Sequence, residues 1–328
     1  RPPGIRVRAT AESRWQDSKV AWRMSVNVNA IARGSHARRR RDTSGWLPLL
    51  TLPVLAVIYR QLFAGWVFMW LLACAIWAGC KWLTWRSTAP GTSWIRSVMY
   101  LFAWPGLDAA NFLTKTTHRP VAVSEWIRSL ACAVTGAVLF AFAAGSSHDS
   151  KSLVVAWAGM AGVALFLHFG TFHLLALAYR SAGIDASPLM RRPARATSLA
   201  DFWGSRWNTS FSKLANDRVF RPLARPIGIA WATLAVFFVS GAIHDLVISL
   251  PARGGFGLPT AYFALQGAFV LFERSRTGRD LGLGRGWRGR VFTLFVILLP
   301  LPLLFHAEFA RNVILPMLEA IGGTWRTP

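Results

Sequence analysis

Long apolar stretches separated by short, mostly basic segments dominate the pattern of this chain. A helix needs about 20 consecutive apolar residues to cross the hydrocarbon core of a bilayer. The stretches that approach this length predict roughly seven spans, or up to nine when two shorter stretches are included. They are residues 46–59, 62–80, 127–144, 152–179, 227–250, 256–272 and 291–307, with 98–104 and 309–321 as the shorter pair. The pattern therefore predicts an all-α fold, a polytopic transmembrane helical bundle.

The polar segments predict which ends of these spans face the cytosol. Lysine and arginine crowd into residues 1–41, 180–225 and 274–290. Short cytoplasmic loops of membrane proteins are enriched in these residues, so we expect the three segments and the N-terminus on the cytoplasmic side. The loop at 145–151 and the turn at 251–255 then lie on the opposite side.

Residues 1–45 are expected to form a basic, disordered arm ahead of a single integral-membrane domain at 46–322. Because the chain begins with Arg1, Met24 is an alternative translation start. Four consecutive arginines at 38–41 directly precede the first predicted span. Such a cluster anchors topology and binds anionic headgroups, so membrane lipids are expected partners.

Composition agrees with a membrane protein and excludes several other classes. Of the 328 residues, 53% are hydrophobic and only 16% are charged, which is too apolar for an ordinary soluble domain. The net charge of +23 is concentrated outside the apolar spans, and no basic helix carries a base-reading pattern, so nucleic acid is not an expected partner. Cys74, Cys80 and Cys132 all lie in apolar stretches and indicate packing residues rather than a disulfide framework or a zinc site.

Ionisable side chains inside predicted spans are the candidates for chemistry, because placing them in a bilayer is costly. His168 and His173 are five residues apart, about 140° around a helix, and so do not hold one metal ion from a single face. His244 differs because Ser240 lies one turn earlier on the same face. Asp245 follows directly, about 100° around the helix. One face of this span therefore combines a hydroxyl with an imidazole.

A polar, aromatic segment reads SLADFWGSRWN at 198–208, and a later apolar span carries FFVSGAIHD at 237–245. These two phrases, in this order, resemble the membrane-bound O-acyltransferase superfamily, in particular its wax-synthase-like branch. YLFAWPGLDAANFL at 100–113 and FALQGAFVLFE at 263–273 are similar to further phrases of that branch. The specific resemblance covers about residues 98–275, which is the expected core motif region.

The resemblance implies transfer of an acyl group from acyl-CoA to the hydroxyl of a lipophilic alcohol, as in wax ester synthesis. His244 matches the essential histidine of the family, and Asn208 matches its polar partner. An alcohol attacks a thioester poorly until a base removes its proton, so His244 is the expected general base in a direct attack without a covalent intermediate. Asn208 is expected to orient the acceptor or to donate to the oxyanion. Acyl-CoA is then a co-substrate, and no permanently bound cofactor or metal is expected.

Five more residues are expected to bind substrate. Trp203 and Trp207 would wall an opening at the membrane interface, and Arg206 would stay near the surface or meet the phosphates of the donor. Ser240 and Asp245 would contribute from the span of the catalytic histidine.

The resemblance has a geometric requirement and one departure. With 199–220 in a cytoplasmic loop, His244 would lie about 26 Å along its helix from the cytoplasmic end, too far to share a substrate with Asn208. Residues 199–220 must therefore fold back into the membrane as a re-entrant or interfacial aromatic segment. The departure is Gln266, where plant members tend to have histidine.

Two alternatives stay open at this stage. A relative of this family could acylate a glycan or another exported hydroxyl compound. A small transporter or scaffold could use His244 and Asp245 as a polar relay. The bias toward arginine over lysine and the many alanines favour a bacterial inner membrane, whereas acyl length, acceptor and oligomeric state are not predicted.

Overall fold

The computed structural model describes residues 43–88, 91–116, 120–147 and 152–323. Every named element in these ranges is helical, which confirms the all-α part of the predicted fold class. The predicted basic arm, including its four arginines and Met24, lies outside the described residues apart from its last few positions.

Among the described residues, five helical segments are long and apolar enough to cross a membrane. The prediction of seven to nine spans is therefore not confirmed, although each of the seven longer apolar stretches does form a helix. Two of the seven are shorter than the rest, namely α2 (Leu47–Ile58) and α13 (Leu258–Glu273). The five long segments are Gly65–Arg86 (α3), Val123–Ser146 (α6), Leu153–Ser181 (α7 to α8), Thr209–Ala252 (α10 to α12) and Gly286–Leu304 (α15 to α16).

Several of these long segments consist of α-helices joined through π-helical turns. A π turn accommodates an additional residue within a helix and is frequent at functional sites. Six occur in the described part of the chain: η3 (Met99–Ala103), η4 (Leu165–Thr171), η6 (Phe202–Arg206), η7 (Asn216–Phe220), η8 (Asp245–Ser249) and η9 (Ala310–Ile314). The α-helices around them are α4 (Trp94–Val98), α7 (Leu153–Ala164), α8 (Phe172–Ser181), α9 (Leu199–Asp201), α10 (Thr209–Ala215), α11 (Arg221–His244), α12 (Leu250–Ala252), α17 (Ala307–Phe309) and α18 (Leu315–Gly323). The other elements are α5 (Ala109–Thr114), α14 (Arg276–Asp280), α15 (Gly286–Leu298), α16 (Leu301–Leu304) and the 3-10 turns η1 (Thr43–Trp46), η2 (Arg60–Leu62) and η5 (Pro193–Arg195).

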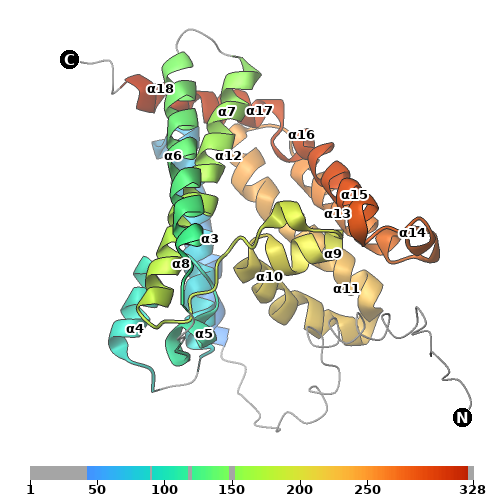
Figure 1. The fold of residues 1–328 in the computed structure, drawn as a ribbon. Helices are drawn as coiled ribbons and strands as arrows, with labels where there is room; N and C mark the ends of the chain where they lie inside the picture. Colours follow the sequence, from blue (N-terminus) through green and yellow to red (C-terminus); the bar gives the residue numbers. More distant parts are fainter. Residues whose placement is uncertain (1–42, 89–90, 117–119, 148–151, 324–328) are drawn as a thin grey trace, which may run out of the picture. The chain divides into compact units, whose positions relative to one another are not determined.

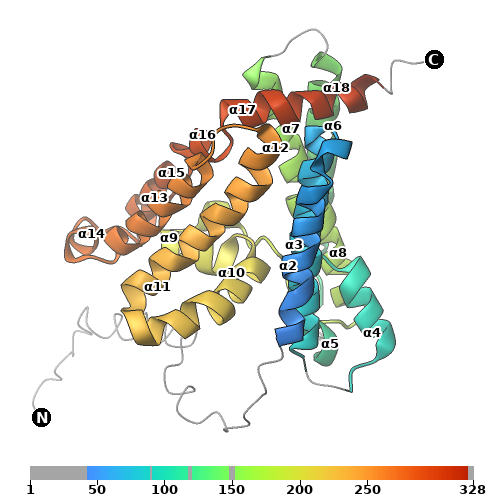
Figure 2. The same cartoon turned by 180° about the vertical axis from the view of Figure 1, so that it is seen from behind.

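The helices of residues 44–323 form two groups. One group contains α3, α6, α7 and α8, and the other contains α11, α13 and α15 (Figure 1). Seen from behind, α2 runs along α3 (Figure 2). Small residues allow close approach within the first group, since a Cβ on Gly162 would lie 2.7 Å from the Phe140 amide nitrogen. Such contacts are typical of helix packing in membranes.

Lys81 is a buried lysine in the first group. The residue is 1% exposed, and its Nζ donates to the Gly106 carbonyl at 2.6 Å. The same nitrogen lies 3.3 Å from the centroid of the Tyr100 ring. Lys81 therefore ties α3 to the loop before α5.

The polar aromatic segment connects the two groups. Residues 199–220 form α9, η6, α10 and η7 in sequence. Trp203 and Trp207 pack against the largest buried cluster, which includes Phe237 of α11 and Phe263 of α13. These contacts bring Trp203 and Trp207 against the helices of the second group, whereas the return of 199–220 into the membrane stays a prediction.

Candidate functional site

His244 is the last residue of α11, and its hydrogen bonding defines its tautomer. The ring Nδ1 lies 2.6 Å from the carbonyl oxygen of Ser240. Because a carbonyl only accepts, Nδ1 carries the proton, and the neutral ring then has a lone pair on Nε2. Within the described residues no group hydrogen-bonds to Nε2. Nε2 is therefore the atom that can accept a proton.

The imidazole of His244 packs on an aromatic ring of the neighbouring helix. Its centroid is 4.4 Å from that of Phe263 on α13. The helices approach closely here because Gly241 has no side chain, since a Cβ at this position would lie 2.7 Å from the Thr260 Cα. The ring of His244 is thus held at the crossing of α11 and α13.

Trp203 reaches the same crossing from the aromatic segment. Its ring is 5.5 Å from Phe263 and 6.0 Å from Phe237, centroid to centroid. Trp203 and His244 therefore contact the same phenylalanine, although 40 positions separate them in sequence. Trp207 stacks on Phe202, with 5.5 Å between the ring centroids.

Two polar residues of α13 hold the aromatic segment in place, and the sequence pattern does not predict either as a site residue. The Trp203 Nε1 donates to the Gln266 Oε1 at 3.2 Å. The Leu199 amide donates to the Glu273 Oε2 at 2.7 Å. Burial raises the pKa of the Glu273 carboxyl, although the hydrogen bond from Leu199 opposes this shift. The spacing of Gln266 and Glu273 could have indicated a shared role, because polar residues seven apart in an apolar helix lie on one face.

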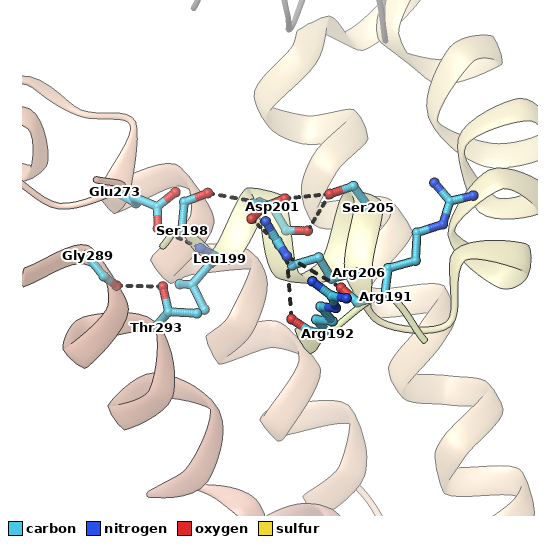
Figure 3. A network of polar contacts seen from close by, with 10 residues as sticks. All are labelled: Arg191, Arg192, Ser198, Leu199, Asp201, Ser205, Arg206, Glu273, Gly289 and Thr293. Carbon is cyan, nitrogen blue, oxygen red and sulfur yellow. Dashed lines mark hydrogen bonds and ion pairs between the residues drawn. The ribbon is translucent and has the colours of Figure 1, made fainter. Parts of the chain in front are cut away.

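Figure 3 shows that Arg206 is fixed by its own segment. Its Nε donates to the Asp201 carboxylate, and its Nη1 lies 3.4 Å from the carbonyls of Arg191 and Arg192. The Ser205 hydroxyl donates to the other carboxylate oxygen at 2.5 Å. The guanidinium is half-buried, with a side-chain exposure of 29%. Contact with donor phosphates stays a prediction for this residue.

Asn208 stands at the start of α10 with left-handed backbone angles, φ 42° and ψ 59°. Asparagine tolerates this conformation better than most residues. Its carbonyl accepts from the Ser212 amide at 3.0 Å, while its side-chain amide makes no hydrogen bond within the described residues. Among the residues that the structure describes, no hydrogen bond or ring contact joins Asn208 to His244, so their shared role stays a prediction.

The Asp245 carboxylate caps α13. It accepts from the Gly257 amide at 2.9 Å, from the Thr260 amide at 3.1 Å and from the Thr260 hydroxyl. The Ser249 hydroxyl adds a fourth hydrogen bond at 2.8 Å. Acidic groups stabilise helix N-termini, where amides lack helical partners. The predicted substrate contacts of Asp245 and Ser240 are not tested by this geometry.

A buried hydrogen-bond chain extends from Asp245 to His306. The Ser249 Oγ lies 3.2 Å from the His306 Nε2. The His306 Nδ1 lies 3.2 Å from the Phe309 amide nitrogen and 3.1 Å from the Glu308 Oε2. Ser249 donates to Asp245. The chain connects the end of α11, the start of α13 and α17.

The residues that the structure describes contain no group of three or more histidine, cysteine or acidic side chains that could hold a metal ion. Cys74 is exposed, Cys80 is buried and Cys132 is partly buried, and all three are free thiols. Their predicted packing role involves no disulfide.

Comparison with known proteins shows which family and which relatives this part of the sequence resembles. Residues 186–265, which include Asn208 and His244, match the model of the membrane bound O-acyl transferase family. The chain is 32% identical over 147 residues to the "Probable long-chain-alcohol O-fatty-acyltransferase 9" of Arabidopsis thaliana, covering 40% of this chain and 42% of that relative. It is 31% identical over 106 residues to the "Long-chain-alcohol O-fatty-acyltransferase" of Simmondsia chinensis, covering 30% of each.

Over this part of the chain, the comparisons confirm the resemblance to the membrane-bound O-acyltransferase family and to its wax-synthase-like branch. With its long apolar helices, the chain is a multi-pass integral membrane protein. It matches 42% or less of the length of these two relatives.

Proposed function

We propose that this chain is an acyl-CoA-dependent O-acyltransferase that esterifies a lipophilic alcohol within the membrane. The observation that carries the proposal is the imidazole of His244, whose proton-accepting Nε2 lies in the segment that matches the family. The names of the plant relatives, long-chain-alcohol O-fatty-acyltransferases, support a fatty acyl group and a long-chain alcohol as substrates.

In the proposed reaction, Nε2 of His244 removes the proton of the acceptor hydroxyl as its oxygen attacks the thioester carbon. The Ser240 carbonyl stabilises the imidazolium that forms, because it keeps its hydrogen bond to Nδ1. When the carbon–sulfur bond breaks, the imidazolium returns the proton to the CoA thiolate. The side-chain amide of Asn208 is proposed to donate to the oxyanion, a contribution of about 2.7–4 kcal/mol for such donors.

The aromatic segment would form the substrate opening. Trp203 and Trp207 offer apolar faces for the acyl chain, while Arg206 and the basic stretch around it would attract CoA phosphates. Ser240 and Asp245 are retained as proposed substrate contacts. The single membrane domain at 46–322 and a cytoplasmic N-terminus are part of this proposal. A bacterial inner membrane rests on composition alone, because the relatives named above are plant proteins.

The test uses membranes or detergent-purified protein with labelled palmitoyl-CoA and a panel of long-chain alcohols, sterol and diacylglycerol. We expect ester formation by the wild type and a rate about 10²–10⁴-fold lower for His244→Ala, because general-base catalysis contributes that much. His173→Ala, another intramembrane histidine variant, should keep the wild-type rate.

Equal activity of wild type and His244→Ala would remove this histidine from the mechanism. Inactivity of both on every lipid acceptor would refute the lipid-ester proposal. A water-soluble hydroxyl compound accepted in place of the alcohols would favour glycan acylation, and the absence of any acyl transfer would favour a transporter or scaffold.

A further inference from the structure

Gln266 is a fully buried amide in an otherwise apolar region of α13, with 0% of its surface exposed. Burying an amide costs free energy unless its hydrogen-bonding atoms find partners. Both ends of this side chain are used. Its Nε2 donates to the Val296 carbonyl at 2.7 Å, and its Oε1 accepts from the Trp203 Nε1 at 3.2 Å.

The bond to Val296 has a clear local cause. In a regular helix the Val296 carbonyl would accept from the amide of residue 300, but residue 300 is proline and has no N–H. Gln266 supplies the missing donor. This anchoring fixes the amide plane, so that the Oε1 points at one place in the aromatic segment.

The second bond places the indole of Trp203 beside the catalytic candidate. Gln266 lies three residues after Phe263, so the two share one face of α13. The Trp203 ring contacts Phe263 at 5.5 Å, and the His244 ring contacts the same phenylalanine at 4.4 Å. Without its hydrogen bond the indole could turn about its side-chain bonds, and Phe263 would lose its contact with Trp203.

We propose that Gln266 is a positioning residue for the proposed acyl transfer. It orients Trp203, and through Trp203 and Phe263 it fixes the ring of His244 relative to the substrate opening. This inference rests on the proposed function of the same site. Gln266 touches none of the reacting atoms, so its loss should act on kcat more than on KM. Misplacing catalytic groups by about 1 Å can cost 10²-fold.

A simpler role would be to join α13 to α15, and the chain offers a matched control for it. Tyr262, also buried, donates its hydroxyl to the Ile297 carbonyl at 3.2 Å. Tyr262→Phe therefore removes a hydrogen bond between the same two helices without touching Trp203. A purely structural role predicts similar effects of the Tyr262 and Gln266 substitutions.

The kinetic test compares full-length Gln266→Leu, Trp203→Phe, the double variant and Tyr262→Phe at equal amounts of folded protein. We expect kcat to fall about 10-fold in Gln266→Leu, with KM for palmitoyl-CoA within about 2-fold of wild type. Tyr262→Phe should keep both constants. The double variant should be no slower than Trp203→Phe, because the bond to Gln266 is already absent in that variant. An equal loss in Tyr262→Phe, or a double variant that shows the product of the single losses, would overturn the inference.

A second readout does not depend on acyl transfer. The protein is labelled with 5-fluorotryptophan, and the ¹⁹F resonance of Trp203 is assigned by its absence in Trp203→Phe. Gln266→Leu should shift or broaden this resonance, whereas Tyr262→Phe should leave it in place. An unchanged resonance in Gln266→Leu overturns the positioning role. A shifted resonance in a protein that transfers no acyl group refutes the proposed function and leaves the indole contact standing. Should Gln266→Leu fold poorly, the kinetics of Trp203→Phe are measured instead, because this variant removes the donor of the same hydrogen bond.

Discussion

Replacing Asp245 by alanine should destabilise the crossing of α11 and α13. The substitution removes the acceptor of four hydrogen bonds, two from the amides of Gly257 and Thr260 and two from the hydroxyls of Ser249 and Thr260. The amides stand at the N-terminus of α13, where no helical carbonyl can replace the carboxylate.

The magnitude follows from these partners. A hydrogen bond to a charged group is worth about 1.5–3 kcal/mol. The Ser249 hydroxyl retains the Gly255 carbonyl at 3.3 Å as an acceptor. The loss of its hydrogen bond to Asp245 is therefore partly compensated. Counting chiefly the two amides gives about 3–6 kcal/mol for Asp245→Ala. Asp245→Asn should lose about half of that, because its NH₂ group would face the Thr260 amide, which also donates.

Reversible unfolding of the purified protein in mixed detergent micelles, followed by circular dichroism, measures the free energies. The expected order of destabilisation is Asp245→Ala, then Asp245→Asn, then Thr260→Val. If Asp245→Ala has the same free energy of unfolding as the wild type, the capping role is refuted. If that variant is stable yet inactive, the carboxylate acts on substrate, as the resemblance implies.

Two further substitutions test the packing that positions the site. Gly241→Val should force α11 away from α13, because even a Cβ there would lie 2.7 Å from the Thr260 Cα. We expect the free energy of unfolding to fall by about 1–3 kcal/mol and kcat to fall as well. Alanine at Gly145, where a Cβ meets no atom within 4 Å, is the control. Lys81→Ala should cost about 2–5 kcal/mol, since it leaves a cavity and an unsatisfied carbonyl at Gly106, whereas Lys81→Met should cost less because it refills the volume. Equal stability of Lys81→Ala and wild type would contradict this account.

The positions of the helices could be predicted from the sequence, because an apolar stretch of sufficient length has few alternatives in a bilayer. The number of spans stays a prediction. The stretches that became α2 and α13 have the composition of a span, but they form helices shorter than the long five. Hydropathy measures how apolar a segment is and does not show where a helix ends.

Residues of the candidate site could be predicted from the sequence only where they lie within a short motif. His244 and Asn208 come from two motifs, and the fold-back follows from the need to bring them together. The partners of the fold-back, Gln266 and Glu273, were not predicted, because an isolated polar residue in an apolar helix has many potential partners until the neighbouring helices are placed. The capping bonds of Asp245 to Gly257 and Thr260 were not predicted, because these groups come together only when the turn between α11 and α13 has folded.

The π turn η8, which begins at Asp245, decides how related chains should be aligned. A turn of this kind holds one residue more than the α-helix it interrupts. Deleting one residue from 245–249 would restore regular winding and rotate the positions beyond it by about 100°. Ser249 would then turn away from His306, and the order of hydrogen bonds at this end of the bundle would change although no polar residue had been lost. We expect insertions and deletions of single residues among relatives to collect here, so an ungapped alignment through this turn would pair residues that occupy different faces.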